Sequence, residues 1–306
     1  MTDLAISTHA LTKTYGRLVA VNNLNLQVAA GEVFGFLGPN GAGKSTTLRM
    51  LLTLISPTQG EIVVFGKNLW KYRNEILRQV GSIIEKPDFY LYLSAYDNLK
   101  IQAQMCGIHP TRKQLEAMFE LVGLSGREHD KVKTYSHGMK QRLGLAQALI
   151  HNPKLIILDE PTTGLDPQGI IDLRSLILRM KNEKGITVLL SSHILSEIEL
   201  IADSMAILSS GKVMVQGRVR DLLNPEDMVV AVEPCDTYTC LAALQNSMWS
   251  TRITSVTETA VMMRMSKGQL PELNRYLAEN RVAMYGISFK RALEDYFLKL
   301  TASGNA

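Results

Sequence analysis

Residues 38–46 combine glycines, a lysine and two hydroxyl side chains in the pattern G-x-x-x-x-G-K-[ST]. The stretch reads Gly38-Pro39-Asn40-Gly41-Ala42-Gly43-Lys44-Ser45-Thr46. An apolar run over residues 32–37 predicts a buried strand before it, and apolar residues three and four apart over residues 46–52 predict a helix after it. A glycine turn between a strand and a helix exposes backbone N–H groups at the positive end of the helix dipole, where they bind phosphate.

Two side chains extend what this turn can bind. Lys44 supplies positive charge for the outer phosphates, and the hydroxyl of Ser45 is placed to hold a magnesium ion. A glycine-rich turn that matched the pattern by accident would not need a strand, a Lys-Ser pair and a helix in this order. We therefore expect residues 38–46 to bind a nucleoside triphosphate together with Mg²⁺.

A second set of residues follows at set distances downstream. The segment Ser136-His137-Gly138 opens an alanine- and leucine-rich helix, with Ser136 as its N-cap. The apolar residues 155–158 predict a strand that ends on Asp159 and Glu160. A carboxylate at that strand end can reach the magnesium shell, and the next one is suited to polarise an attacking water as a general base. The alternative, a solvated strand end, fits poorly beside a phosphate loop.

Together with Asp166, in Gly164-Leu165-Asp166, and His193, in Ser192-His193, these motifs resemble the ATP-binding-cassette (ABC) ATPases over roughly residues 4–220. The resemblance implies catalytic roles for Lys44, Glu160 and His193, of which His193 contacts the terminal phosphate. It also implies that Tyr15 stacks on adenine. A lone histidine is more often structural, and a tyrosine before a glycine is ordinary in a turn, so these two assignments depend on the resemblance.

The resemblance further implies that the nucleotide sites are shared between two chains. In ABC ATPases the turn at Ser136 and Gly138 contacts the ATP held by the opposite subunit, and the loop of Asp166 crosses the interface. This chain has a single copy of each motif. We therefore expect turnover to require a head-to-tail pair that encloses two ATP molecules. The second cassette is either another copy of this chain or a paralogue.

One position departs from the common family pattern. After the predicted strand at residues 80–84, most of the family has a glutamine that touches magnesium and links the site to the membrane partner. This chain has Glu85, which would place a formal negative charge at the metal. A glutamate here, with a short C-terminal domain ending near residues 293–298, resembles the ABC subunits of bacitracin-resistance and lantibiotic-immunity exporters. The alternative is a tolerated substitution in an unrelated exporter subunit.

The order of the predicted elements indicates an α/β cassette over residues 1–220 and a small α+β domain over residues 221–306. Strands alternate with helices in the cassette, and their continuously apolar character predicts a parallel sheet covered on both faces. We expect strands at residues 4–9 and 24–28, a polar turn at residues 12–16, and helix over residues 94–125. The second domain has the order β-α-β-β-α-β plus a last helix at residues 290–300, the split-βαβ arrangement. No catalytic constellation is visible there, so a small interaction or dimerisation domain is expected.

Composition and charge limit the kinds of partner and cofactor that this chain is expected to bind. The formal net charge of the 306 residues is +4, which is too small to indicate nucleic-acid binding. The three cysteines lack C-x-x-C spacing, so neither a disulfide framework nor a zinc site is expected. No apolar run reaches the roughly 18 to 20 residues of a membrane span. We expect a protein bound peripherally to the cytoplasmic face of the cell membrane by a separate transmembrane permease subunit.

Three functions remain to be compared. The first is the ATPase subunit of an exporter. The second is a soluble ABC ATPase that acts on ribosomes or DNA, but the ribosomal type carries two cassettes and the DNA-repair type a long coiled coil. Here about 90 residues without heptads separate Lys44 from Ser136. The third is a catalytically silent cassette, which the intact catalytic residues argue against. The exporter is the prediction, and the cargo and the direction of transport depend on the membrane subunit.

Overall fold

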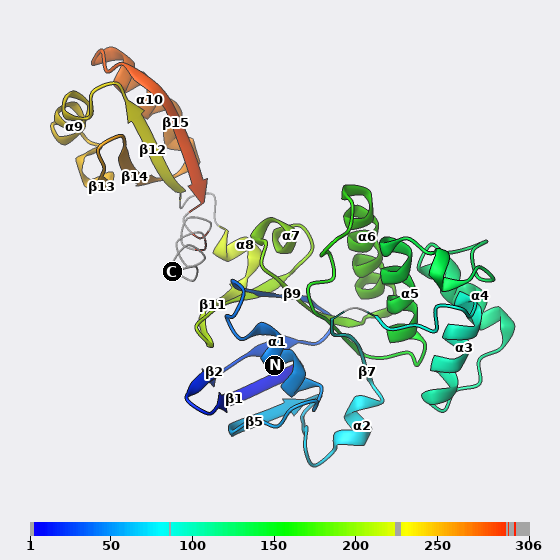
Figure 1. The fold of residues 1–306 in the computed structure, drawn as a ribbon. Coiled ribbons are helices and arrows are strands. Elements are labelled where there is room, and N and C mark those ends of the chain that lie inside the picture. The colour runs from blue at the N-terminus through cyan, green and yellow to red at the C-terminus, as the bar shows by residue number, and fades with distance from the viewer. Residues whose placement is uncertain (1–2, 86, 224–227, 292, 294–296, 298–306) are drawn as a thin grey trace. The chain divides into compact units, whose positions relative to one another are not determined.

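The computed structural model describes residues 3–85, 87–223, 228–291, 293 and 297. The chain forms two compact units, Met1–Gly217 and Arg218–Ala306 (Figure 1). Every residue that the sequence predicts for nucleotide chemistry lies in the first unit. Among the helices of the described residues, none combines the length and the apolar character needed to cross a lipid bilayer.

A six-stranded sheet forms the centre of the first unit, in the order β11-β10-β4-β9-β8-β7. Its strands are β4 (Val33–Leu37), β7 (Val80–Ile83), β8 (Leu155–Leu158), β9 (Thr187–Ser192), β10 (Ser204–Ser209) and β11 (Lys212–Arg218). From β10 to β7 the neighbouring strands run parallel. Strands β4, β8 and β9 are buried along their whole length. The predicted parallel sheet is therefore confirmed.

Alternation along β4 separates the two faces of this sheet. Phe34 and Phe36 belong to an apolar core that also contains residues of helix α1 (Lys44–Leu51). Gly35 faces the other way, because a Cβ added there would lie 2.3 Å from Ile198 of helix α7 (Leu195–Glu199). Helix α6 (Pro167–Lys184) also packs on β4 and β9. The sheet is covered on both faces, as its apolar strands require.

The first unit also contains an antiparallel sheet that the sequence pattern did not predict. Its order is β2-β1-β5-β6, with β3 paired to β1, and α1 lies between the two sheets (Figure 1). The strands are β1 (Leu4–Tyr15), β2 (Leu18–Leu24), β3 (Gln27–Ala29), β5 (Gln59–Val64) and β6 (Lys67–Asn68). The predicted polar turn at residues 12–16 is wrong, because Thr12 to Tyr15 continue β1 and the chain turns at Gly16. The single strand predicted at residues 24–28 is also wrong, because β2 ends at Leu24 and β3 begins at Gln27.

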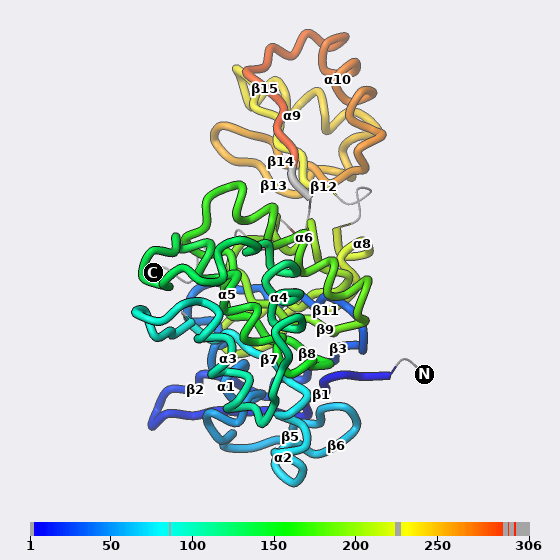
Figure 2. Tube along the Cα trace, turned by 90° about the vertical axis from the view of Figure 1, so that its right-hand side faces the viewer, coloured from blue at the N-terminus to red at the C-terminus, as the bar shows by residue number. Residues whose placement is uncertain are grey.

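Helices α3 (Ala95–Met105), α4 (Arg112–Leu121) and α5 (His137–Leu149) pack on one another beside the parallel sheet (Figure 2). The helical stretch predicted over residues 94–125 is interrupted between α3 and α4, where Gly107 has a φ of +74°. Thr111 and Gln114 then form a capping box that starts α4. The short helix α2 (Arg73–Leu77) precedes this group in the sequence, and the short helix η1 (Val132–Thr134) lies between α4 and α5.

The described residues of the second unit form a four-stranded antiparallel sheet together with several short helices. Its order is β13-β14-β12-β15, which is the predicted split-βαβ arrangement. The elements are α8 (Val219–Leu222), β12 (Met228–Pro234), α9 (Thr237–Gln245), η2 (Ser250–Arg252), β13 (Ile253–Val256), β14 (Val261–Met265), η3 (Lys267–Gln269), α10 (Leu270–Glu279) and β15 (Met284–Arg291). Of the helix predicted at residues 290–300, residues 290 and 291 belong to β15 instead. Most of the remainder lies outside the described residues.

Candidate nucleotide-binding site

The phosphate loop connects β4 to α1 through two positions that require glycine. Gly43 is the N-cap of α1 with a φ of +102°, and a Cβ there would lie 2.6 Å from the carbonyl oxygen of Ala20. A Cβ at Gly38 would lie 2.6 Å from the carbonyl oxygen of Leu208. These close approaches fix the loop at the start of α1, where the N–H groups of the first turn have no acceptor within the helix and can bind phosphate. The conformation of the loop is therefore compatible with phosphate binding.

Lys44 is held at the start of α1 with its side chain only 5% exposed. Its Nζ donates hydrogen bonds to the carbonyl oxygens of Gly38 (2.6 Å) and Pro39 (3.2 Å). The same atom lies 3.2 Å from Oε1 of Glu160. A buried ammonium group is stable only where acceptors and an opposite charge surround it. The charge of Lys44 is therefore kept at the loop, beside the predicted general base.

The two carboxylates that follow β8 are oriented by a serine at the end of β9. The hydroxyl of Ser191 donates to Oδ1 of Asp159 (2.6 Å) and accepts from the backbone N–H of Glu160 (2.8 Å). Glu160 has a φ of +48°, a left-handed conformation that is uncommon for a residue with a side chain. The turn at this residue carries Glu160 toward Lys44, while Asp159 remains at the strand end.

Glu160 also contacts His193, the histidine that is predicted to contact the terminal phosphate. Its Oε2 lies 2.6 Å from Nδ1 of His193. Its Oε1 is buried and makes no hydrogen bond among the described residues, although Lys44 is nearby. Buried carboxylate oxygens normally accept a hydrogen bond, so this atom is suited to accept one from a water molecule. The structure thus brings together Lys44, Asp159, Glu160 and His193, as the sequence predicts.

Ser136, Gly138 and Asp166 lie together in a separate hollow of about 550 Å³. The hydroxyl of Ser136 caps α5 by accepting from Met139 N–H (3.2 Å), and Oδ1 of Asp166 caps α6 by accepting from Gly169 N–H (3.2 Å). Two helix N-termini therefore open at the same place, and each favours negative charge. The residues that line this hollow do not include Lys44, Glu160 or His193.

The cap at Asp166 leads to a stability prediction. Asp166→Ala is expected to lower the free energy of unfolding by about 1 kcal/mol, because it removes the acceptor for the first turn of α6. Asp166→Asn keeps an acceptor oxygen and is expected to stay within a few tenths of a kcal/mol of the native value, about the spread among good caps. Urea unfolding of the full chain measures both. Equal losses for the two variants would contradict a capping role.

Glu85 follows β7 and pairs with a residue that sequence reasoning missed. Its carboxylate forms an ion pair with the guanidinium of Arg49, which lies one helical turn beyond Ser45 on α1. The signal was present in the sequence, since Arg49 is a basic residue on the helix that the phosphate loop opens. In this structure the charge of Glu85 is balanced by Arg49.

Tyr15 lies at the end of β1 with its side chain 47% exposed. The Nζ atom of Lys13 lies 5.0 Å from the centre of its ring, within the range of a cation–π contact. The ring is therefore accessible for stacking on adenine, which is its predicted role.

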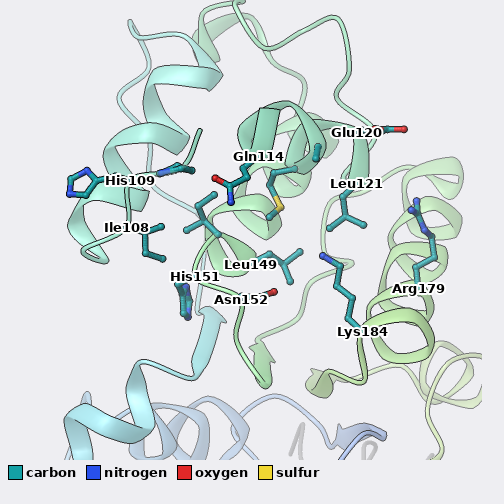
Figure 3. A pocket seen from close by; sticks show the side chains of 14 residues that line it. Ile108, His109, Gln114, Glu120, Leu121, Leu149, His151, Asn152, Arg179 and Lys184 are labelled. Carbon is teal, nitrogen blue, oxygen red and sulfur yellow. The ribbon is translucent and has the colours of Figure 1, made fainter. Parts of the chain in front are cut away.

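A larger hollow, of about 690 Å³, lies away from the phosphate loop between α4 and the C-terminal ends of α5 and α6 (Figure 3). Gln114, Leu121 and Leu149 line it, and Lys184 extends toward them from α6 (Figure 3). Its lining contains none of the residues that the sequence predicts for nucleotide chemistry.

Comparison with known proteins agrees with this geometry. The ABC transporter family matches residues 21–163. The bacitracin transport ATP-binding protein BcrA of Bacillus licheniformis is 41% identical over 98% of this chain and 98% of its own length. The lantibiotic transport ATP-binding protein SrtF of Streptococcus pyogenes is 44% identical over 71% of this chain and 93% of its own.

Solved structures show the same fold. CbiO1 of Clostridium perfringens, part of an ABC transporter complex, gives a TM-score of 0.65 at 27% identity and covers 72% of this chain and 90% of its own. A dimeric ATP-binding cassette in a post-hydrolysis state with ADP and Pi gives a TM-score of 0.64 at 26% identity, over 70% of this chain and 99% of its own. With a relative that is 41% identical over 98% of both chains and the predicted nucleotide-binding residues brought together, this chain belongs to the ATP-binding subunits of the ABC transporters, which are ATPases.

Proposed function

We propose that this chain powers the export of a peptide antibiotic through a separate membrane-spanning subunit, at the cytoplasmic face of the cell membrane. The observation that carries the substrate class is the match to the bacitracin transport protein, which covers 98% of both chains and so includes both units. Glu85 adds to it, because a glutamate at this position resembles the same group. The second unit would serve as an interaction domain of that transporter.

The hydrolytic step follows from the cluster around Glu160. The N–H groups of the loop and Lys44 bind the phosphates of ATP, and Lys44 exchanges its bonds to the carbonyl oxygens of Gly38 and Pro39 for phosphate oxygens. Oε1 of Glu160 accepts a proton from the attacking water, while His193, bonded to Oε2, contacts the terminal phosphate. This assignment gives a role in hydrolysis to the ammonium group of Lys44 and to both carboxylate oxygens of Glu160.

A magnesium ion fits the oxygen atoms beside this cluster. The hydroxyl of Ser45 and the carboxylate of Asp159 are the hard oxygen ligands that Mg²⁺ prefers, and the ion would neutralise charge on the phosphates. Because Ser191 fixes Oδ1 of Asp159, the carboxylate is held at the end of β8. Glu85 would add negative charge near this ion, and its ion pair with Arg49 of α1 would partly offset that charge.

The second half of each nucleotide site would come from another cassette. Ser136, Gly138 and Asp166 form a hollow apart from Lys44 and Glu160, so one chain holds two incomplete halves. A head-to-tail pair of cassettes joins the phosphate loop of one chain to the α5 N-terminus of the other. A structural relative is a dimeric ATP-binding cassette, which supports the pairing of two cassettes.

An exposed aromatic segment follows Glu85 and is the proposed contact with the membrane subunit. Tyr90 and Tyr92 are 62% and 78% exposed. The carbonyl oxygens of Leu91 and Leu93 accept hydrogen bonds from the N–H groups of Lys133 and Val132, close before Ser136. The segment therefore connects Glu85 with the α5 N-terminus through backbone bonds. Exposed aromatic side chains are typical of protein interfaces.

Bacitracin protection tests the proposed function. Bacitracin-sensitive bacteria that express this chain with its membrane subunit are expected to tolerate more bacitracin than bacteria that express the Glu160→Gln chain with the same subunit. Equal tolerance with the two chains, at equal amounts of folded protein, would reject peptide export and leave the ATPase assignment in place.

The same protection assay, combined with ATP hydrolysis, shows whether Glu85 acts in hydrolysis itself or in coupling hydrolysis to the membrane subunit. Glu85→Gln is expected to change ATP hydrolysis by less than about fivefold, because an exposed ion pair contributes at most about 1 kcal/mol. It is expected to lose protection, because the charge beside the membrane contact is gone. Arg49→Gln removes the partner and leaves the glutamate in place as the matched variant. Native protection with Glu85→Gln would make this substitution neutral and remove the support that Glu85 gives to the proposal.

A further inference from the structure

One carboxylate outside the catalytic cluster joins two segments that carry catalytic residues. Oε2 of Glu197, on α7, accepts a hydrogen bond from the hydroxyl of Thr162 (2.8 Å) and another from the hydroxyl of Ser192 (2.9 Å). Ser192 is 1% exposed, and Thr162 and Glu197 are partly buried. Two donors on one shielded carboxylate oxygen form a charge-assisted pair of bonds, stronger than neutral ones.

The two donors stand directly beside the predicted catalytic groups. Thr162 is two residues after Glu160 and four before Asp166, in a turn where Thr163 N–H donates to the Glu160 carbonyl (3.1 Å). Ser192 immediately precedes His193 at the end of β9. The carboxylate of Glu197 therefore fixes the segment from Glu160 to Asp166 against the segment that carries His193. The Glu160–His193 contact alone would not fix the position of the residues between Glu160 and Asp166.

We propose that Glu197 is a positioning residue that sets the loop of Asp166 relative to His193 and thereby holds Glu160 in register for hydrolysis. The proposal rests on the proposed roles of Glu160, His193 and Asp166. It differs from them in that Glu197 acts on the catalytic groups through the hydroxyls of Thr162 and Ser192. Its effect should appear in the rate of the chemical step and not in ATP binding.

A purely structural role makes a different prediction. Glu197 lies in the first turn of α7, where any acidic residue stabilises the helix dipole. In that case the hydroxyl of Thr162 would be irrelevant, because the glutamate would remain in place without it. Thr162→Val keeps the branched shape of the side chain and removes only the hydroxyl. This variant therefore separates positioning from helix stabilisation.

Steady-state ATP hydrolysis by the assembled transporter tests the proposal with three variants. Thr162→Val is expected to lower kcat about tenfold with KM unchanged, the size expected when one such bond is lost from the transition state, and Glu197→Ala, which loses both bonds, at least as much. Glu197→Gln keeps an acceptor oxygen for both hydroxyls and is expected to retain most of the native kcat. Thermal unfolding of each variant verifies that the chain is folded.

The outcomes separate this proposal from the function on which it rests. Native kcat in Thr162→Val would overturn it, as would a rise in KM that accounts for the whole loss. A Glu197→Gln variant as slow as Glu197→Ala would show that the charge and not the acceptor matters, and would also overturn it. If Glu160→Gln itself turned over ATP at the native rate, the catalytic assignment would fail first, whatever the result at Glu197.

Discussion

Glu160→Gln is expected to lower ATP turnover by at least about a hundredfold, the smallest effect usual for the loss of a general base. The amide cannot take the proton that the attacking water must lose. Oε1 of the native glutamate is buried without a hydrogen bond among the described residues, so this atom can accept the proton of the water. Phosphate release by the assembled transporter measures the loss.

ATP binding is expected to survive the same substitution. Glu160 is an anion 3.2 Å from Lys44, so a neutral side chain there leaves the lysine freer to bind phosphate. Titration with a fluorescent ATP analogue checks that affinity is retained or increased. Glu116→Gln, which makes the same chemical change on the exposed face of α4, is the control and should leave turnover at the native rate. Native turnover by Glu160→Gln would remove the catalytic assignment.

The sequence predicts this cluster because its determinants are local. The glycines of the phosphate loop, the four apolar residues of β8 and the polar end of β9 each lie within a few residues of the group they position. The parallel sheet then brings the carboxyl ends of β4, β8 and β9 to one edge. The split-βαβ order of the second unit was also predictable from local sequence, because its short strands and helices follow one another along the chain and a turn joins β13 to β14.

The parts that were not predicted depend on pairing between distant segments. The antiparallel sheet requires β1 to pair with β5, so that Thr8 lies opposite Ile62. A period-two pattern in a short strand does not reveal such a partner, and the polar residues 12–15 read as a turn. The bonds of Glu197 and the Arg49–Glu85 pair are single contacts between side chains. They leave no periodic signal, and only the folded chain brings them together.

Gly138→Asp is the second substitution expected to abolish turnover, at least about a hundredfold, while the chain stays folded. A Cβ at Gly138 would meet only Leu165 Cδ2, at 3.7 Å, so the backbone and the neighbours admit a side chain. A carboxylate at the N-terminus of α5 is also favourable for the helix. The same charge would repel the phosphates of the ATP held by the partner cassette, at a cost of about 4 kcal/mol for charges about 4 Å apart. Gly138→Ala is the matched control and should stay active.

A mixture of two inactive variants decides whether the sites are shared between chains. In a dimer of Gly138→Asp with Glu160→Gln, one site combines the intact Glu160 of the first chain with the intact Gly138 of the second. The other site carries both defects. We expect phosphate release to reappear on mixing, although each variant alone is inactive. Differently tagged chains verify that the mixed dimer has formed. If activity did not recover in that dimer, Lys44 and Gly138 of one chain would belong to the same nucleotide site, and the head-to-tail arrangement would be rejected.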